Sequence, residues 1–165
     1  MAQLTLRPAE PADCAQILAF IQGLAEYERE PDAVEATEAH LQRTLFADAP
    51  KVFGIMAELD GAPAGFAVYF FNYSTWLGRH GLYLEDLFVD PALRGRGVGL
   101  ALLRHLAAIA VAEGCGRFEW MALDWNEPAI DFFRAAGAVP MDEWTVYRLS
   151  GEALRAFAGG GDGAL

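Results

Sequence analysis

A hairpin signal in the first half of the chain constrains the fold more than any other feature. Two runs rich in aliphatic and aromatic residues, 51–59 and 63–74, flank the dipeptide Asp60-Gly61. Asp-Gly between two such runs is a strong indicator of an antiparallel hairpin. The segment GLYLEDLFV, residues 81–89, predicts another strand after the hairpin. The middle of the chain is therefore expected to form a sheet.

The remaining segments alternate between helical and extended patterns. A short strand is expected at 4–7, and helices are expected at 11–28, at 38–46 with Thr37 as N-cap, and at 98–114, where Gly114 ends an Ala- and Leu-rich run. A strand is expected at 117–125, a helix at 127–138 with Pro128 in its first turn, a strand at 144–150 and a last helical turn or two at 151–158. No repeat or linker interrupts this order, so we expect one α/β domain over residues 1–158 and a flexible glycine-rich tail over 159–165.

The charge of the chain limits its partners. Its 165 residues carry 12 Lys plus Arg against 23 Asp plus Glu, a formal net charge of -11. The resulting field repels nucleic acid and anionic membranes and attracts small cations. No apolar run is long enough to span a membrane and the first residues lack a signal-peptide pattern, so we expect a cytoplasmic protein. Cys14 and Cys115 have no spacing typical of disulfide frameworks or zinc sites, and we expect no metal.

The hexapeptide RGRGVG, residues 94–99, stands between the strand at 81–89 and the helix at 98–114. Its glycines allow a ligand to approach the backbone closely, and the free N–H groups of a helix start favour an anion. Arg94 and Arg96 add fork-shaped hydrogen-bond donors. Taken alone, such a hexapeptide is as often a tight turn with two solvated arginines. It matches neither the dinucleotide-binding fingerprint nor the P-loop.

This loop resembles the R/Q-x-x-G-x-G/A motif of the GCN5-related N-acetyltransferases (GNAT), which holds the pyrophosphate of acetyl-coenzyme A. The order of elements matches that family. Within it, YLEDLFV, LDWNEPAIDFF and AEYE resemble the diamine acetyltransferases, including the spermidine/spermine and thialysine N-epsilon enzymes. The resemblance extends over roughly residues 4–157. It implies the GNAT fold, a mixed, mostly antiparallel sheet that splays between the strands at 81–89 and 117–125 and carries flanking helices, and it implies a homodimer.

The resemblance also assigns the cofactor site. The strand backbone at 87–89 would pair with the pantetheine arm of acetyl-CoA as an added strand does. The implied cofactor-binding residues are Leu87, Phe88, Val89, Arg94, Gly95, Arg96, Gly97, Val98, Gly99, Asn126, Pro128 and Phe133. Asn126 could instead cap the helix that begins near Pro128.

One position departs from the family pattern. The family usually has a tyrosine that protonates the departing thiolate where this chain has Phe133. A thiolate, with a pKa near ~8.5, can leave without a proton donor. Water, Tyr147 or Tyr83 could supply the proton instead.

For the amine, the resemblance points to Glu85 as the catalytic residue. An alkylammonium has a pKa near ~10 and must lose a proton before it attacks, which a carboxylate can accept. Tyr27 and Glu28 match the pair that lines the amine site in these enzymes, although alone they would be an ordinary helix end. Trp76 and Glu143 are further substrate-binding candidates. Strict strand alternation places Asp86 on the face opposite Glu85 unless a bulge intervenes.

The chain is therefore expected to be an N-acetyltransferase that transfers the acetyl group of acetyl-CoA to a primary amine of a small cationic substrate, a polyamine or a lysine-like compound such as thialysine. Two alternatives stay open. The substrate could be another amine, such as an aminoglycoside or a protein N-terminus. The chain could also be a catalytically impaired acetyl-CoA sensor, for which Phe133 is the only sequence argument.

Overall fold

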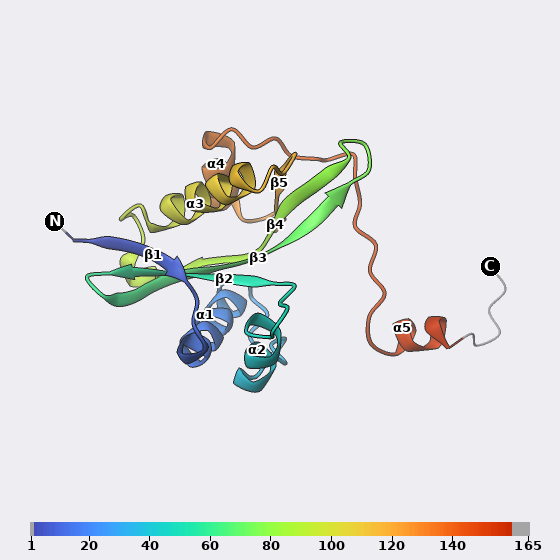
Figure 1. Ribbon diagram of the computed structural model, residues 1–165, viewed down its shortest axis with the longest axis horizontal. Coiled ribbons are helices and arrows are strands. Elements are labelled where there is room, and N and C mark those ends of the chain that lie inside the picture. The colour runs from blue at the N-terminus through green and yellow to red at the C-terminus, as the bar shows by residue number, and fades with distance from the viewer. Residues whose placement is uncertain (1, 160–165) are drawn as a thin grey trace. The chain divides into compact units, whose positions relative to one another are not determined.

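The structure is a computed structural model that describes residues 2–159 (Figure 1). Of the tail expected at 159–165, residues 160–165 lie outside the described residues. The chain divides into two compact units, Met1–Leu123 and Asp124–Leu165. Each unit is described by itself, and a single domain over residues 1–158 stays a prediction.

The first unit contains a five-stranded sheet and three α-helices. The strands lie side by side in chain order: β1 (Leu4–Pro8), β2 (Phe53–Leu59), β3 (Ala62–Ser74), β4 (Arg79–Val89) and β5 (Phe118–Glu119). The helices are α1 (Cys14–Tyr27), α2 (Glu38–Leu45) and α3 (Val98–Ala112), and two 3-10 turns are η1 (Pro11–Asp13) and η2 (Pro91–Leu93). Neighbouring strands are antiparallel except for the parallel pair of β4 and β5. The expected mixed, mostly antiparallel sheet is confirmed.

Local sequence signals explain where these elements begin and end. Asp60 and Gly61 both have positive φ angles, 52° and 79°, and form the turn of the expected β2–β3 hairpin. Thr37 is the N-cap of α2, because its hydroxyl oxygen accepts a hydrogen bond from the backbone N–H of His40 at 3.2 Å. The hairpin and the cap are both as expected.

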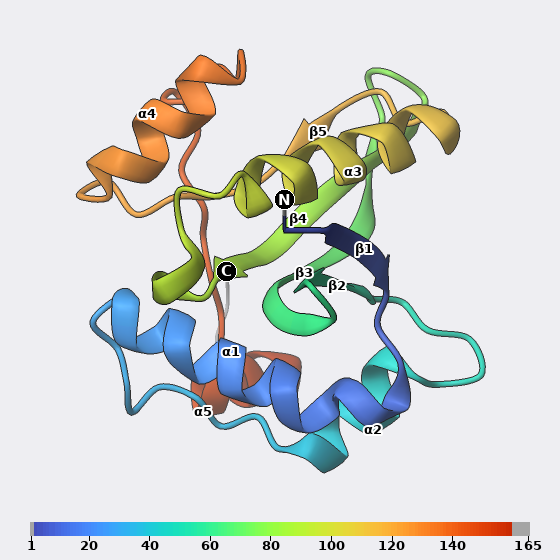
Figure 2. The ribbon, with the colours of Figure 1, turned by 90° about the vertical axis from the view of Figure 1, so that its left-hand side faces the viewer.

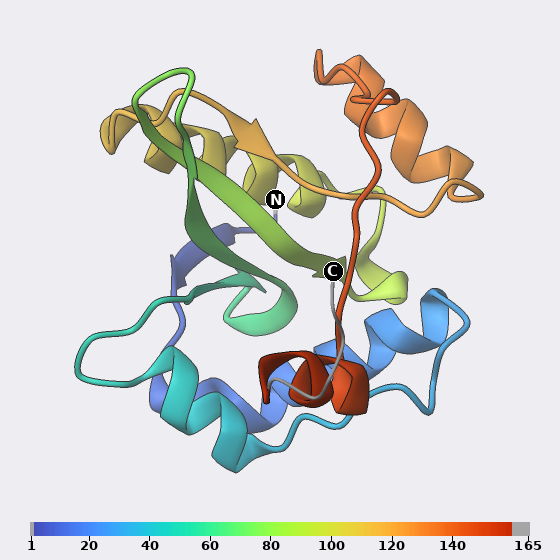
Figure 3. The ribbon, with the colours of Figure 1, turned by 90° about the vertical axis from the view of Figure 1, so that its right-hand side faces the viewer.

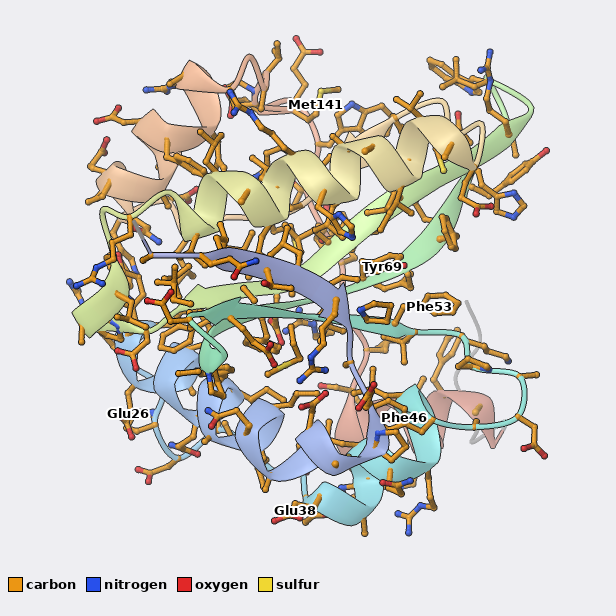
Figure 4. The ribbon with its side chains drawn as sticks, turned by 60° about the vertical axis from the view of Figure 1, so that its left-hand side comes forward. Glu26, Glu38, Phe46, Phe53, Tyr69 and Met141 are labelled. Carbon is orange, nitrogen blue, oxygen red and sulfur yellow. The ribbon has the colours of Figure 1, made fainter. Side chains whose placement is uncertain are left out.

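Helices cover both faces of the sheet in the first unit. Helices α1 and α2 lie on one face and α3 lies on the other, as Figure 2 shows. The core beneath α1 and α2 consists of Ile17, Phe20, Leu45, Met56, Phe66 and Phe88. At its centre the ring of Phe20 stacks on that of Phe66 with centroids 5.6 Å apart. At the far end of the hairpin the rings of Phe53 and Tyr69 stack at 5.4 Å (Figure 4).

An ion-pair network fixes the start of α1 against the sheet. Arg7 on β1 contacts Asp13 at 2.7 Å and Glu58 on β2 at 2.7 Å. The hydrogen bonds from Arg7 lower the pKa of Asp13. This network joins β1, η1 and β2, and it orients the helix whose other end carries Tyr27.

The second unit contains α4 (Glu127–Ala135) and α5 (Gly151–Ala158). Pro128 lies in the first turn of α4, and Gly137, with a φ of 90°, follows its end, as expected. The strand expected at 144–150 is wrong, since the described part of the unit contains no strand. A strand needs a neighbour for its backbone groups, and here the β-prone side chains of Val146 and Tyr147 are 67% and 92% exposed.

The strand expected at 117–125 is much shorter in the structure. Only Phe118 and Glu119 pair with β4, opposite Leu82 and Tyr83. Beyond this contact the two strands separate, which is visible where the chain leaves β5 in Figure 3. The sequence of 117–125 does not indicate where the pairing stops, because the end of the pairing depends on the separation of this segment from β4 and not on the residues of the segment itself.

Candidate active site

The middle of β4 contains a β-bulge at Glu85. Val68 of β3 pairs with Asp86, but the next residue, Tyr69, pairs with Leu84, so Glu85 is an extra residue in the ladder. Glu85 is exposed and Asp86 is half-buried. A bulge re-aims side chains, and this one interrupts the alternation of the strand.

The bulge corrects the expected assignment of faces. Val68 packs against the core under α1 and α2, and its partner Asp86 shares that face. Tyr83 pairs with Phe70, two residues further along the same face of β3. Glu85 follows Tyr83 by two residues, so Tyr83, Glu85 and Asp86 are brought to one face, and Asp86 does not point away as strict alternation predicts.

The charges of two carboxylates act on a third carboxyl group at this place. Burial, together with the negative charges of Glu85 and Glu28, raises the pKa of Asp86 to about 6. Burial also raises the pKa of Glu28. Such a group of acids is costly for the empty protein, and a cation that neutralises it would bind favourably.

The end of α1 supplies the next part of the site. Tyr27 is the last residue of the helix and Glu28 is its C-cap. The connection that follows is acidic and runs from Glu26 on α1 to Glu38 at the start of α2, both labelled in Figure 4. Glu28 and Glu85, two of the residues that the sequence assigned to the amine, both lie near enough to Asp86 for their charges to act on it.

One edge of β4 is open beside the bulge. Beyond Tyr83, no strand among residues 2–159 pairs with the side of β4 that faces β5. Leu87, Phe88 and Val89 lie in this part of the strand. Apart from the carbonyl of Val89, which accepts a hydrogen bond from Arg94, no strand of the described chain uses the backbone groups on this side, and they suit an extended ligand, as in β-augmentation.

The glycine loop leads from this edge into α3. Gly95 and Gly97 have φ angles of 76° and 81°, which L-residues with side chains rarely adopt. A Cβ atom at either position would meet no heavy atom within 4 Å. Gly97 is the N-cap of α3 and Val98 its first residue, and the helix makes its first backbone bond from Ala101 to Gly97. The N–H groups before Ala101 lie at the positive end of the helix and suit an anion.

Arg94, at the start of the loop, turns toward α1. Its guanidinium carbon lies 4.9 Å from the centroid of the Tyr27 ring and 5.8 Å from that of Phe88. Its Nε donates a hydrogen bond to the carbonyl of Val89 at 3.3 Å. The loop expected to hold the cofactor and the helix end expected to line the amine site are therefore in direct contact.

The other candidates lie elsewhere in the fold. Trp76 is 91% exposed in the turn between β3 and β4, and the strand from Arg79 to Glu85 alone spans about 20 Å at ~3.3 Å per residue. The structure does not bring Trp76 to Glu85 within one chain.

Four candidates belong to the second unit. Asn126 is at the N-cap position of α4 without a side-chain capping bond, and Pro128 lies in the first turn of the same helix. Phe133 on α4 packs its ring against Phe132 at 5.6 Å, and Glu143 lies exposed in a turn. Among residues 2–159 no three His, Cys, Asp or Glu side chains are arranged to hold a metal, and no helix there could span a membrane.

Asp86 is the residue of the site that sequence reasoning missed. The signal that could have found it is the pair Glu85-Asp86 inside an otherwise apolar strand. Two adjacent carboxylates there require either one buried acid or a break in alternation.

Comparison with known proteins agrees with this geometry. Residues 17–138 match the acetyltransferase (GNAT) family. The chain is 38% identical to the thialysine N-epsilon-acetyltransferase of Bos taurus, over 96% of this chain and 99% of that protein. It is 34% identical to the spermidine/spermine N(1)-acetyltransferase-like protein 1 of Homo sapiens, over 93% of this chain and 24% of that protein.

Among solved structures, an integron cassette protein from the mobile metagenome of V. cholerae superposes with a TM-score of 0.79 at 29% identity, covering 94% of this chain and 97% of that one. The expected resemblance is thus confirmed over nearly the whole chain. The chain belongs to the acetyltransferase (GNAT) family and is an N-acetyltransferase that uses acetyl-CoA as its acetyl donor.

Proposed function

We propose that the chain acetylates a primary amine of a small cationic substrate, a polyamine or a lysine-like compound such as thialysine. One observation carries this proposal: the bulge brings Glu85 and Asp86 to one face, where Glu28 adds a third carboxyl group. One relative is named a thialysine N-epsilon-acetyltransferase and another a spermidine/spermine N(1)-acetyltransferase-like protein. Both names support the same substrate class. The net charge of -11 favours the approach of cations.

In the proposed reaction the amine is first held as a cation by Glu28 and Asp86. Glu85, the exposed carboxylate of the three, accepts one proton from it, directly or through water. The amine nitrogen then attacks the thioester carbonyl, and a backbone N–H of the open edge of β4 stabilises the oxyanion. The new C–N bond forms, the C–S bond breaks, and the sulfur leaves as a thiolate that takes up a proton.

The cofactor would lie along β4 and end at the glycine loop. The backbone at Leu87, Phe88 and Val89 would pair with the pantetheine arm. The pyrophosphate would sit on the N–H groups of residues 95–99, where two glycines leave open space. Arg94 and Arg96 would add charge, and Asn126, Pro128 and Phe133 of the second unit would contact the cofactor in the manner of the family.

A phenol of the first unit can supply the proton that the thiolate needs. Tyr83 shares a face with Glu85. Burial raises the pKa of Tyr83, and the charges of Glu85 and Glu119 add to this effect. Tyr83 therefore keeps its proton at neutral pH, and it is our candidate for the donor that Phe133 cannot provide.

The protein is also proposed to be a homodimer in the cytoplasm. The segment 144–150 is β-prone but has no partner strand in the described chain, and Trp144, Val146 and Tyr147 are exposed. A second copy would cover such a segment. In that dimer Trp76 and Glu143 could reach an amine site across the boundary. The two free cysteines suit a reducing compartment. Sedimentation equilibrium tests the dimer, and a monomer at micromolar concentration would contradict it.

A thiol-release assay with acetyl-CoA tests the function. The panel holds thialysine, lysine, spermidine, an aminoglycoside and a peptide with a free N-terminus. The proposal expects turnover of the small diamines and lysine-like amines at a far higher kcat/KM than of the peptide. If only the aminoglycoside or only the peptide is acetylated, the proposed substrate class is wrong and that amine takes its place. Binding of acetyl-CoA without turnover of any amine would favour the sensor.

A further inference from the structure

A pair of opposite charges lies at β5, beside the bulge of β4. The Nε of Arg117 contacts Oε1 of Glu119 at 2.8 Å, and the two side chains are 41% and 34% exposed. Glu119 stands opposite Tyr83 in the parallel ladder, so its side chain is on the face of the sheet that also carries Glu85. Arg117 precedes Glu119 by two residues and shares that face. The pair therefore belongs to the surface on which the amine is proposed to bind.

Glu85 and Glu119 are both close to the hydroxyl group of Tyr83. Burial raises the pKa of Tyr83, and the charges of Glu85 and Glu119 raise it as well. Glu119 is displaced from Glu85 by two residues of β4 and one strand spacing, which separates the two backbones by about 8 Å. An extended side chain of lysine or thialysine has a comparable reach. A substrate whose terminal amine is at Glu85 would thus present its α-carbon to Arg117 and Glu119.

Two neighbouring residues hold this pair in its place. Gly81 of β4 leaves room for Arg117 to lie across the strand, since a Cβ there would be 3.1 Å from Cγ of Arg117 and would collide with Oδ1 of Asn72. Asn72 donates a hydrogen bond from Nδ2 to Oε1 of Glu119 at 3.3 Å. Its Oδ1 is then buried without a hydrogen-bond partner within residues 2–159, which lowers stability. Such an atom calls for a reason other than stability.

The unused groups of the pair are complementary to an α-amino acid. Arg117 and Asn72 contact the same oxygen of Glu119, and the hydrogen bonds of residues 2–159 leave its Oε2 and the two terminal nitrogens of Arg117 unused. The carboxylate oxygen accepts from an ammonium, and the guanidinium donates to a carboxylate. An α-amino acid carries both groups on one carbon. A polyamine carries only ammonium groups, which Glu119 attracts and Arg117 repels.

We infer, on the basis of the proposed function, that Arg117 and Glu119 recognise the α-carboxylate and the α-ammonium of a lysine-like amino acid whose side-chain amine is acetylated. The substrate class is thereby narrowed from small cationic amines to α-amino acids with a terminal amine. The net charge of -11 opposes the approach of a carboxylate, so such a substrate needs a local positive group, which Arg117 supplies. Both residues determine specificity, while the proton transfer stays with Glu85.

Three matched amines test this recognition with the full chain and saturating acetyl-CoA. Lysine carries both α-groups, cadaverine is lysine without the carboxylate, and ε-aminocaproate is lysine without the α-amino group. The wild type should acetylate lysine with a kcat/KM about ten-fold or more above that of either analogue, because each analogue loses a charge-assisted hydrogen bond. The long-range field alone would favour cadaverine, the more positive compound, so a preference for lysine requires local recognition.

Each of two variants should remove one part of this preference. Arg117→Gln should reduce the preference for lysine over cadaverine to below about two-fold, and Glu119→Gln should do so for lysine over ε-aminocaproate. Arg104→Gln is the matched control, since it removes the same charge from an exposed position on α3, on the other face of the sheet. It should keep the wild-type preferences. A ratio between two substrates of one variant is unaffected by partial loss of folded protein, so a destabilised variant remains informative.

The outcomes separate the recognition from the proposed function. If the wild type acetylates cadaverine or spermidine as well as lysine, the recognition of an amino acid is wrong and the proposed function stands. The recognition is also wrong, with the function intact, if either variant keeps the wild-type ratio. If none of these amines is acetylated, the proposed function is overturned together with the recognition.

Discussion

Asp86 lies directly opposite Val68 in the β3–β4 ladder, so its carboxyl group is on the face of the sheet that packs against α1. This single pairing places an acid of raised pKa beside Glu85 and Glu28. In the proposed function this carboxyl group contributes to the amine site, and its raised pKa means that it lowers the stability of the empty protein at neutral pH.

Replacing Asp86 by asparagine should therefore raise the stability of the protein and lower its affinity for the amine. With a pKa of about 6 instead of 3.8, folded Asp86 holds its proton more tightly than in the unfolded chain, so it lowers stability progressively as pH rises from about 4 to 6 and fully above that range. Asp86→Asn should raise the free energy of unfolding at pH 7.5 by up to about 3 kcal/mol, and this gain should vanish below about pH 4. Urea titrations across pH measure it.

The same variant should lose affinity for the amine. We expect KM for a cationic amine to rise about ten-fold or more, since a charge-assisted hydrogen bond is lost. The control is Asp48→Asn, which changes an exposed carboxylate outside the site and should change neither quantity. A variant that binds amine normally, or that gains no stability at pH 7.5, would show that Asp86 is only a structural group.

The glycine loop can be tested with one substitution. Gly97→Asp should abolish measurable binding of acetyl-CoA, because a carboxylate and a new Cβ would occupy the open space where the pyrophosphate is proposed to lie. Titration calorimetry measures the affinity. The matched control is Gly78→Asp in the turn between β3 and β4, where φ is also positive at 66° and a Cβ would meet no heavy atom within 4 Å; it should keep the wild-type affinity. Unchanged affinity in Gly97→Asp would place the cofactor elsewhere.

Phe133→Tyr should restore a proton donor for the thiolate. The change adds one hydroxyl to a ring on α4 and should leave the fold intact. If departure of the thiolate limits the rate, the variant should turn over faster, most clearly at low pH, where a phenol with a pKa of about 10 stays protonated. Steady-state rates across pH check this. An unchanged or slower variant would mean that another donor already serves, and Tyr83→Phe and Tyr147→Phe would then identify it.

The sequence predicts the frame of the fold well, because its signals are local. The Asp60-Gly61 turn and the Thr37 cap each specify a boundary through their own backbone or side chain. The motif RGRGVG in addition indicates the acetyltransferase family to which the chain belongs. From these signals the first four strands, the helices and the glycine loop follow with shifts of only a few residues at their ends.

What the sequence does not predict depends on pairing between distant segments. The bulge at Glu85 is a property of the register between β3 and β4, and alternation within β4 alone assigns Asp86 to the wrong face. The pairing of β5 stops at Glu119 because β4 and β5 diverge, although the pattern continues. The contact between Arg94 and Tyr27 joins residues 67 positions apart, which no local motif records.

The most direct test of the central claim is the pH dependence of Glu85→Gln. With a cationic amine and saturating acetyl-CoA, turnover should fall by about 10²-fold or more near neutral pH, the usual share of a general base. Acetyl-CoA affinity should change little. The deficit should shrink as pH rises toward the pKa of the amine, about 10, because the substrate then arrives already deprotonated. A deficit that stays constant across this range would contradict the account and would limit Glu85 to holding the substrate.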